Sequence, residues 1–396
     1  MTRKRGWALV LILCACIFAG CGSSAAPEPE PQTEAGIESG TEEVSDSEAY
    51  EKFEESVSVD EAEVSDSGIP AENGYSSTYG AARERDGDKV RSCLSGKMVP
   101  AEIGDRRPVA IMLNNIEDAM PMSGVSYADV LYECVVEGSL TRMMGIFENY
   151  DDLKKIGSVR SCRNYFVYYA LEYDAIYCHY GQSSYALPLL EQNNVDNLSG
   201  LAAIGDTVYY RTTDRVAPHN AYASAKGIKK GIEEMGYRNV YKDDFMGKFT
   251  FARDGDENDL SFDGTYAVTH IEPGYRINRP VLEYNAEDKK YYRSQYGTEH
   301  VDDLNGEQLS FDNVILQYSR WEQIDDKGYL GFDCHGGGEM KFFTRGRAVD
   351  GVWLSLGGEQ GAVRYYDLNG EEIVLNQGKT LIEIIQDTEG DKVITE

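Results

Sequence analysis

The sequence predicts a mixed α/β fold, in which an N-terminal α/β domain is followed by a mostly antiparallel, β-rich C-terminal domain. Two observations carry this prediction. In the first half of the folded region, short apolar runs alternate with helical patterns, which is typical of α/β proteins. After Phe245, strand-like runs follow one another with turn signals between them, as in antiparallel sheets.

Residues 1–20 have the pattern of a signal peptide. Cationic residues at positions 3–5 precede an apolar run of about 12 residues, which is shorter than the roughly 20 that a membrane-spanning helix needs. Ala19, Gly20 and Cys21 then follow as in a lipobox, whose cysteine receives a diacylglycerol before cleavage. We predict lipidation at Cys21, with palmitate-type chains that anchor the protein on the extracytoplasmic face of the cell membrane. The alternatives are lipidation at Cys16 or an ordinary secretory cleavage.

Residues 21–90 are predicted to form a disordered, acidic tether. Between Pro27 and Gly80, sixteen acidic residues accompany one lysine, so this stretch holds about half of the net charge of −30. It has too few large apolar residues to build a core. Its acidity also argues against a nucleic-acid partner, because phosphate backbones require clustered Lys and Arg.

Residues 91–255 carry the α/β pattern of the predicted N-terminal domain. Apolar runs predict strands, and the longer amphipathic stretches predict helices. The segment 125–138 fits either a helix face or a buried strand. The predicted strands are 107–115, 141–149 and 174–180, and the predicted helices are 161–173, 183–193 and 226–237.

Residues 256–396 carry the alternating pattern of the predicted C-terminal domain. The Asn369-Gly370 pair between two such runs is a hairpin signal. The polar stretch 254–259 is the best candidate for the junction between the domains. The predicted strands are 266–275, 313–321, 338–346, 362–375 and 380–386.

Five cysteines remain after the predicted processing, and their spacing matches neither a CxxC motif nor a set of metal ligands. We interpret most of them as small buried apolar residues, with one disulfide left open. They are Cys93, Cys134, Cys162, Cys178 and Cys334.

An ordered series of segments resembles the YerB-like lipoproteins, a bacterial family with an N-terminal and a C-terminal domain of unknown function. The N-terminal segments include RPVAIMLNN, IGSVRSCRNYFVYYALEYDAIYCHYGQS and YYRTTDRVAPHNAY, and the C-terminal ones include YYRSQYGTEHVDD, FDNVILQ, HGGGEM and LNQGKTLIEII. The resemblance implies lipoprotein character and a two-domain division, but no catalytic residue. At Cys162 the family usually has a small residue such as Ala, which argues against a catalytic thiol.

The best candidate site combines two loops that precede predicted helices. Arg160 and Arg163 flank Ser161, a candidate N-cap, so guanidinium and free backbone N–H groups would face an anion together. The second loop, 179–184, follows a strand, where α/β proteins collect ligands. We hypothesise that one anionic site is formed by Arg160, Arg163, His179, Ser183, Arg211 and His219. The alternative is that these arginines pair with Glu133, Glu137 or Asp129 and brace the fold.

Motifs for a specific catalytic or metal-binding chemistry are incomplete. Gly181-Gln182-Ser183-Ser184-Tyr185 lacks the closing glycine of a nucleophile elbow. His300 with Asp302 and Asp303 could join a metal site, but turn and surface roles are preferred. We expect no cofactor and no metal.

Three functional classes stay open. We favour an envelope module that binds a cell-wall polymer, a lipid-linked precursor or an envelope protein. The second class is a hydrolase or transferase that uses His179 or His219 as a general base. The third is a structural or assembly lipoprotein.

Overall fold

The computed structural model describes residues 83–243, 245, 247–355 and 362–396. The predicted signal peptide, Cys21 and most of the predicted tether lie outside the described residues. The described part is mostly β-sheet, with mixed and antiparallel sheets. The mixed, strand-rich fold is therefore confirmed, whereas the α/β character of the N-terminal domain stays a prediction. No helix in the described ranges combines the length and apolarity that a membrane crossing demands.

Eleven strands of the described residues form one central sheet. Its order is β13-β23-β22-β19-β26-β5-β6-β4-β8-β9, with β24 also paired to β23. The strands are β4 (Val109–Asn114), β5 (Val130–Val135), β6 (Thr141–Phe147), β8 (Ile176–His179), β9 (Asn197–Ser199), β13 (Thr265–Ala267), β19 (Asn313–Ser319), β22 (Gly337–Thr344), β23 (Arg347–Ser355), β24 (Val363–Asp367) and β26 (Thr380–Gln386).

Strand β26 joins the two halves of the chain. It pairs in parallel with β19 on one side and with β5 on the other, so the sheet continues across the predicted boundary at residue 255. All residues of β5 are buried, as are all those of β26 except its last. Burial on both faces explains why the ambiguous segment 125–138 has no clear alternation, since such strands are apolar along their whole length. The boundary itself stays a prediction.

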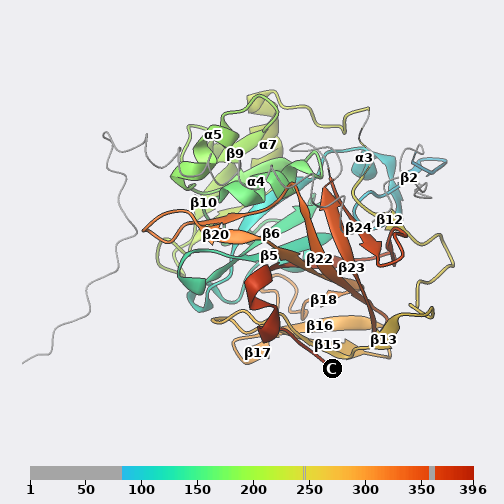
Figure 1. Ribbon diagram of the computed structural model, residues 1–396. Helices are drawn as coiled ribbons and strands as arrows, with labels where there is room; N and C mark the ends of the chain where they lie inside the picture. Colours follow the sequence, from blue (N-terminus) through green and yellow to red (C-terminus); the bar gives the residue numbers. More distant parts are fainter. Residues whose placement is uncertain (1–82, 244, 246, 356–361) are drawn as a thin grey trace, which may run out of the picture. The chain divides into compact units, whose positions relative to one another are not determined.

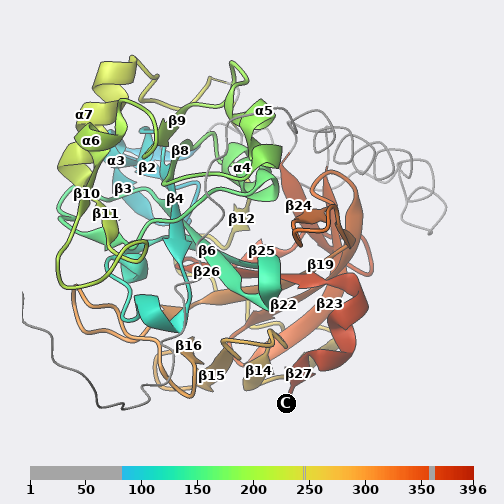
Figure 2. The ribbon, with the colours of Figure 1, turned by 90° about the vertical axis from the view of Figure 1, so that its left-hand side faces the viewer.

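The α-helices of the described chain all come from its N-terminal half. Figures 1 and 2 show α4, α5 and α7 above the central sheet and β14 to β16 below it. The helices are α3 (Ala101–Gly104), α4 (Asn164–Leu171), α5 (Leu187–Leu190), α6 (Gly205–Val208) and α7 (Ala225–Met235), and five short 3-10 turns are η1 (Glu117–Ala119), η2 (Val125–Tyr127), η3 (Glu137–Ser139), η4 (Ser184–Ala186) and η6 (Asp387–Lys392).

Helix α7 shows how local sequence sets a helix. The hydroxyl of Ser224 accepts a hydrogen bond from the N–H of Gly227 at 3.1 Å and caps the first turn. Gly236 ends the helix with a φ of 67°, a conformation that glycine adopts without strain. A Cβ atom on Gly227 would lie 2.6 Å from the carbonyl oxygen of Val208, so this glycine lets α7 approach α6 closely.

Smaller sheets complete the described part. A six-stranded sheet has the order β17-β16-β15-β14-β27, with β18 on β16. Its strands are β14 (His270–Glu272), β15 (Val281–Asn285), β16 (Lys290–Gln295), β17 (Thr298–Glu299), β18 (Ser310–Phe311) and β27 (Ile394–Thr395). The others are β1 (Arg85–Asp86), β2 (Lys89–Arg91) and β3 (Met98–Pro100); β7 (Ile156–Gly157), β10 (Tyr209–Arg211) and β11 (Ala221–Ala223); β12 (Thr250–Phe251) with β25 (Val374–Leu375); and β20 (Trp321–Gln323) with β21 (Leu330–Phe332).

The turn predicted at Asn369-Gly370 is confirmed. Gly370 has a φ of 84°, and backbone hydrogen bonds from Asp367 to Glu371 and from Ile373 to Tyr365 close the turn.

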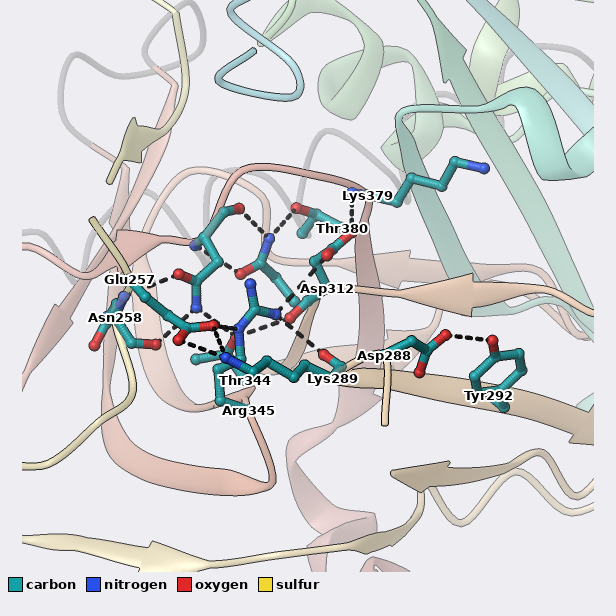
Figure 3. Close-up of polar contacts among 12 residues, drawn as sticks. Glu257, Asn258, Asp288, Lys289, Tyr292, Asp312, Thr344, Arg345, Lys379 and Thr380 are labelled. Carbon is teal, nitrogen blue, oxygen red and sulfur yellow. Dashed lines mark hydrogen bonds and ion pairs between the residues drawn. The ribbon is translucent and has the colours of Figure 1, made fainter. Parts of the chain in front are cut away.

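The predicted junction at 254–259 is held by polar contacts. Figure 3 shows Glu257 between Lys289 and Arg345, with carboxylate-to-nitrogen distances of 2.8 and 2.5 Å. Asn258 follows, and its carbonyl oxygen accepts a hydrogen bond from Asn376 at 2.7 Å. These contacts tie the segment to three separate parts of the C-terminal region.

Candidate functional site

The two loops of the predicted site lie side by side. The N–H of Tyr180 donates to the carbonyl oxygen of Arg160 at 3.0 Å, and the N–H of Cys162 donates to that of Gly181 at 2.9 Å. The N–H of Ser183 donates back to the carbonyl oxygen of Cys162 at 3.1 Å. The two loops are therefore in direct contact, whereas their convergence on one anionic site stays a prediction.

The loops meet at the carboxyl ends of parallel strands. Strand β8 pairs in parallel with both β4 and β9. The segment 157–162 inserts beside the end of β4, because Arg160 donates its N–H to Met112 at 3.1 Å and Asn114 donates to Ser158 at 2.9 Å. This edge of a parallel sheet is where α/β folds place ligands.

Ser161 is not the N-cap of the helix that follows, so that prediction is wrong. Helix α4 begins at Asn164, and Arg163 precedes it in an extended conformation without a side-chain cap. The hydroxyl of Ser161 instead donates to the carbonyl oxygen of Tyr180 at 3.3 Å. Ser161 therefore joins the two loops to each other and does not start the helix.

Arg163 has the bracing role that the alternative foresaw. Its guanidinium donates to both carboxylate oxygens of Glu137, at 2.5 and 2.6 Å, and to the carbonyl oxygen of Cys162 at 2.9 Å. Burial disfavours the charged form of both residues. The hydrogen-bonded ion pair nevertheless raises the pKa of Arg163 and lowers the pKa of Glu137. Arg163 therefore holds the loop rather than facing solvent.

Positive charge is nevertheless concentrated here. Arg142, from β6, donates to the carbonyl oxygen of Ser161 at 2.6 Å. Its pKa falls to about 9, first because it is buried and then because Arg163 and Arg160 carry like charges nearby. Three guanidinium groups thus act on one small region, a setting in which an anion is favoured.

His179 and Ser183 lie inside the protein. His179 is fully buried, with Nδ1 2.8 Å from the carbonyl oxygen of Gly181 and Nε2 3.2 Å from Oδ1 of Asn197. Burial lowers its pKa more than these hydrogen bonds raise it. Ser183 is also buried, and its hydroxyl has no hydrogen-bond partner among the described residues. Neither side chain reaches the surface at which a ligand would arrive.

Arg211 and His219 lie at that surface. Arg211, at the end of β10, is exposed; it donates to Oδ1 of Asn220 at 2.8 Å, and its guanidinium lies 4.7 Å from the ring centre of Tyr180. Nδ1 of the half-buried His219 lies 2.9 Å from the side-chain nitrogen of Asn114, at the end of β4. Backbone pairing carries these residues to the loops, because the N–H of Val159 donates to the carbonyl oxygen of Ala221 at 2.7 Å.

The five cysteines among the described residues are buried and form no disulfide with one another, as was predicted for most of them. Burial raises the pKa of both Cys162 and Cys178 to about 12. These thiols therefore stay protonated at neutral pH and are poor nucleophiles.

Of the turn and surface roles preferred for Asp302, the turn role is confirmed, because its carboxylate accepts the N–H of Leu304 at 2.8 Å, but the surface role is wrong. Its carboxylate is fully buried and accepts hydrogen bonds from the N–H groups of Gly124 and Ser126, at 2.8 and 2.7 Å. Asp303 forms an ion pair with Lys155 at 2.9 Å. In the ranges that the structure describes, three or more His, Cys, Asp or Glu side chains do not gather as metal ligands would.

Sequence reasoning missed a buried polar network between β5, β16 and β26. Arg293 donates to the carboxylate of Glu133, which also accepts from Asn115 at 2.7 Å and from Asn278 at 2.6 Å. Glu383, the register partner of Glu133, lies 4.0 Å from Arg293. Burial, and then the charge of Glu133, raise the pKa of Glu383 well above its usual range. The sequence signal for this network was a glutamate inside each of two apolar strands, Glu133 in β5 and Glu383 in β26.

Comparisons with known proteins agree with the fold. Residues 94–238 match the family described as "Protein of unknown function (DUF3048) N-terminal domain", and residues 271–382 match its C-terminal domain. YerB of Bacillus subtilis (strain 168), named as a lipoprotein, is 30% identical over 304 residues, which cover 76% of this chain and 87% of that protein. A crystal structure of YerB from Bacillus subtilis matches with a TM-score of 0.66 and 27% identity, over 77% of this chain and 99% of that one. The chain therefore belongs to the YerB-like protein family.

Proposed function

We propose that the protein is a lipid-anchored module of the cell envelope that binds an anionic ligand at the surface formed by Arg211 and His219, beside the buried Arg160. The concentration of guanidinium groups around Arg142 carries this proposal, because burial and then the like charges of Arg163 and Arg160 depress its pKa, and an anion would offset those charges. The ligand is a phosphate- or carboxylate-bearing envelope polymer or lipid-linked precursor.

The geometry supports a binding surface rather than a catalytic centre. Arg211 is held over Tyr180 and against Asn220, so its planar group has little freedom to lose when a ligand arrives. His179 is buried, and its ring nitrogens lie beside the oxygens of Gly181 and Asn197 rather than at the surface, so we assign it to the scaffold.

The lipid anchor rests on the lipobox pattern before Cys21 and on the name of the relative as a lipoprotein. Cys21→Ala should abolish incorporation of labelled fatty acid and release the protein from the membrane fraction. Retention of the label in this variant would refute anchoring at Cys21.

Binding is tested by calorimetry on the full-length chain, with an oligomer of glycerol phosphate compared with an uncharged glycerol oligomer. We expect the charged oligomer to bind and Arg211→Ala to weaken it about tenfold, as when one charge-assisted hydrogen bond is lost. Arg211→Lys should recover only part of the affinity, because lysine lacks the planar pair of N–H donors of the guanidinium group. Arg253→Ala, at an exposed arginine far along the chain, is the control. Equal affinity of the Arg211→Ala and Arg253→Ala variants would refute the site.

A further inference from the structure

A separate cavity of about 330 Å³ lies between the two regions that match the family domains. The N-terminal region contributes Glu117, Met120 and Pro121, and the C-terminal region contributes the end of β16 and the residues around β17. Its volume is at the lower end of the range for small-molecule sites. Its residues differ from those of the proposed anionic site, so a ligand can occupy this cavity whether or not an anion binds there.

His300 is one of the residues that line this cavity, and its ring carries a fixed, buried hydrogen-bond donor. Nη1 of Arg293 lies 2.6 Å from Nδ1 of His300, and because arginine only donates, Nδ1 must be the acceptor. The imidazole is therefore neutral and carries its proton on Nε2. His300 is 2% exposed, and its Nε2 has no partner among the described residues. A buried donor of this kind calls for an acceptor from outside the described chain.

The buried network keeps that donor in place. Arg293 is held by the carboxylate of Glu133, which Asn115 and Asn278 also contact. Gln295, which lines the cavity, donates to Oδ1 of Asn115 at 3.0 Å. The positive charge of Arg293 also polarises the imidazole and strengthens Nε2–H as a donor. The His300 side chain is thus oriented before any ligand arrives.

The rest of the cavity divides into an apolar wall and an acidic rim. Met120, Pro121 and Tyr296 supply the wall, and the hydroxyl of Tyr296 is already engaged with the carbonyl oxygen of Asn115 at 2.9 Å. Glu117 and Glu299 are exposed at the rim, one from each region. An occupant would therefore present an acceptor oxygen to His300, a small apolar body to the wall, and a cation to the rim.

We propose that this cavity binds a ligand of the amino-acid type, either a free amino acid or the end of a short peptide. Its carboxylate or carbonyl oxygen accepts the hydrogen bond from Nε2 of His300, and its ammonium group lies beside Glu117 and Glu299. Because residues from both family regions would touch the ligand, binding also stabilises the folded chain in proportion to ligand concentration.

The probe is alanyl-alanine, titrated into the full-length chain by calorimetry, with free alanine and N-acetyl-alanyl-alanine alongside. We expect alanyl-alanine or free alanine to bind, and the stronger of the two identifies the source of the ligand. Acetylation removes the ammonium charge and should weaken the dipeptide about tenfold, which is the sum of two modest exposed ion pairs. Absence of binding by both unmodified probes at about 10 mM would overturn the proposal.

The rim is tested by Glu117→Gln combined with Glu299→Gln, both at exposed positions where folding should be unaffected. This double variant should lose about tenfold in affinity for the ammonium-bearing probe and nothing for the acetylated one. Glu287→Gln, at an exposed turn elsewhere, is the matched control. Equal losses of affinity for both probes would show that the two glutamates do not recognise the ammonium group.

The donor is tested without disturbing the buried network. In protein with ¹⁵N-labelled histidine, the Nε2–H signal of His300 should shift when the better probe is added, while the ring N–H signal of His179 should not. A shift at His179 with none at His300 would contradict the proposed pose.

Discussion

Replacement of Lys248 by methionine should destabilise the protein strongly. The side chain of Lys248 is fully buried and forms an ion pair with Glu172, whose side chain is 5% exposed. Four aromatic rings surround the ammonium group at 5.3 to 6.0 Å, from Tyr132, Tyr173, Phe249 and Tyr365. Methionine fits this cage but leaves a buried carboxylate.

The loss of unfolding free energy in Lys248→Met depends on the contacts that Glu172 retains. In Lys248→Met its remaining side-chain contact in the described structure is the hydroxyl of Tyr132 at 3.4 Å. Removing one partner of a buried pair costs about 3–5 kcal/mol in the free energy of unfolding. In the native protein burial already raises the pKa of Glu172 and lowers the pKa of Lys248, so desolvation outweighs the attraction within the pair. Replacing both, with Glu172→Leu added, should therefore restore the native stability or exceed it.

The assay is urea unfolding at pH 8 and pH 5. The folded-state pKa of Glu172 in the variant lies above its unfolded value, so the folded protein takes up a proton as the pH falls. The loss of stability in Lys248→Met should thus shrink at pH 5. Lys289→Met is the control, because Lys289 pairs with Glu257 at the surface and should cost less than about 1 kcal/mol. A single variant as stable as this control, or a double variant as unstable as the single, would refute the reasoning.

Three further predictions concern buried polar groups and close packing. Burial raises the pKa of Asp129 to about 6 and that of Glu148 to about 7, so both folded-state values exceed the unfolded ones. Their contribution to stability is full below about pH 4 and is lost as the pH rises through about 7. Chemical denaturation should therefore show the protein losing about 5 kcal/mol between these limits, and Glu148→Gln should remove about half of that slope; an unchanged slope would contradict the assignment. Asp302→Ala should lower the free energy of unfolding by about 1–3 kcal/mol, because the N–H groups of Gly124 and Ser126 lose their acceptor; Asp303→Ala, at an exposed ion pair, should stay near the native value in the same urea titration. Gly378→Ala should reduce the thermal midpoint, because residue 378 has a φ of 145° and a Cβ atom there would lie 1.9 Å from the carboxylate of Asp312. Gly297 also has a positive φ but faces open space, so Gly297→Ala should lower the thermal midpoint less. Equal losses would show that backbone strain alone decides.

The meeting of the two candidate loops could be predicted, because both precede predicted helices and one follows an apolar strand, the position at which α/β sheets collect their ligand-binding loops. The burial of His179 could not. It lies in a strand whose four residues are all buried, and only the helices and loops packed on both faces make them so. Likewise, Arg163 could be recognised as a charged group at a helix start, but its pairing with Glu137 rather than with a ligand depended on where η3 lies.

The sequence by itself determined the local elements. Apolar runs placed β4, β6 and β8, and Ser224 with Gly236 bounded α7, because propensity, burial pattern and capping act within a few residues. Only the tertiary structure decided that β26 lies between β5 and β19, and that Arg293 meets Glu133 across 160 positions of sequence. Sheet order and buried ion pairs depend on hydrogen bonds and charges between distant segments, and these become close neighbours only when the whole core packs.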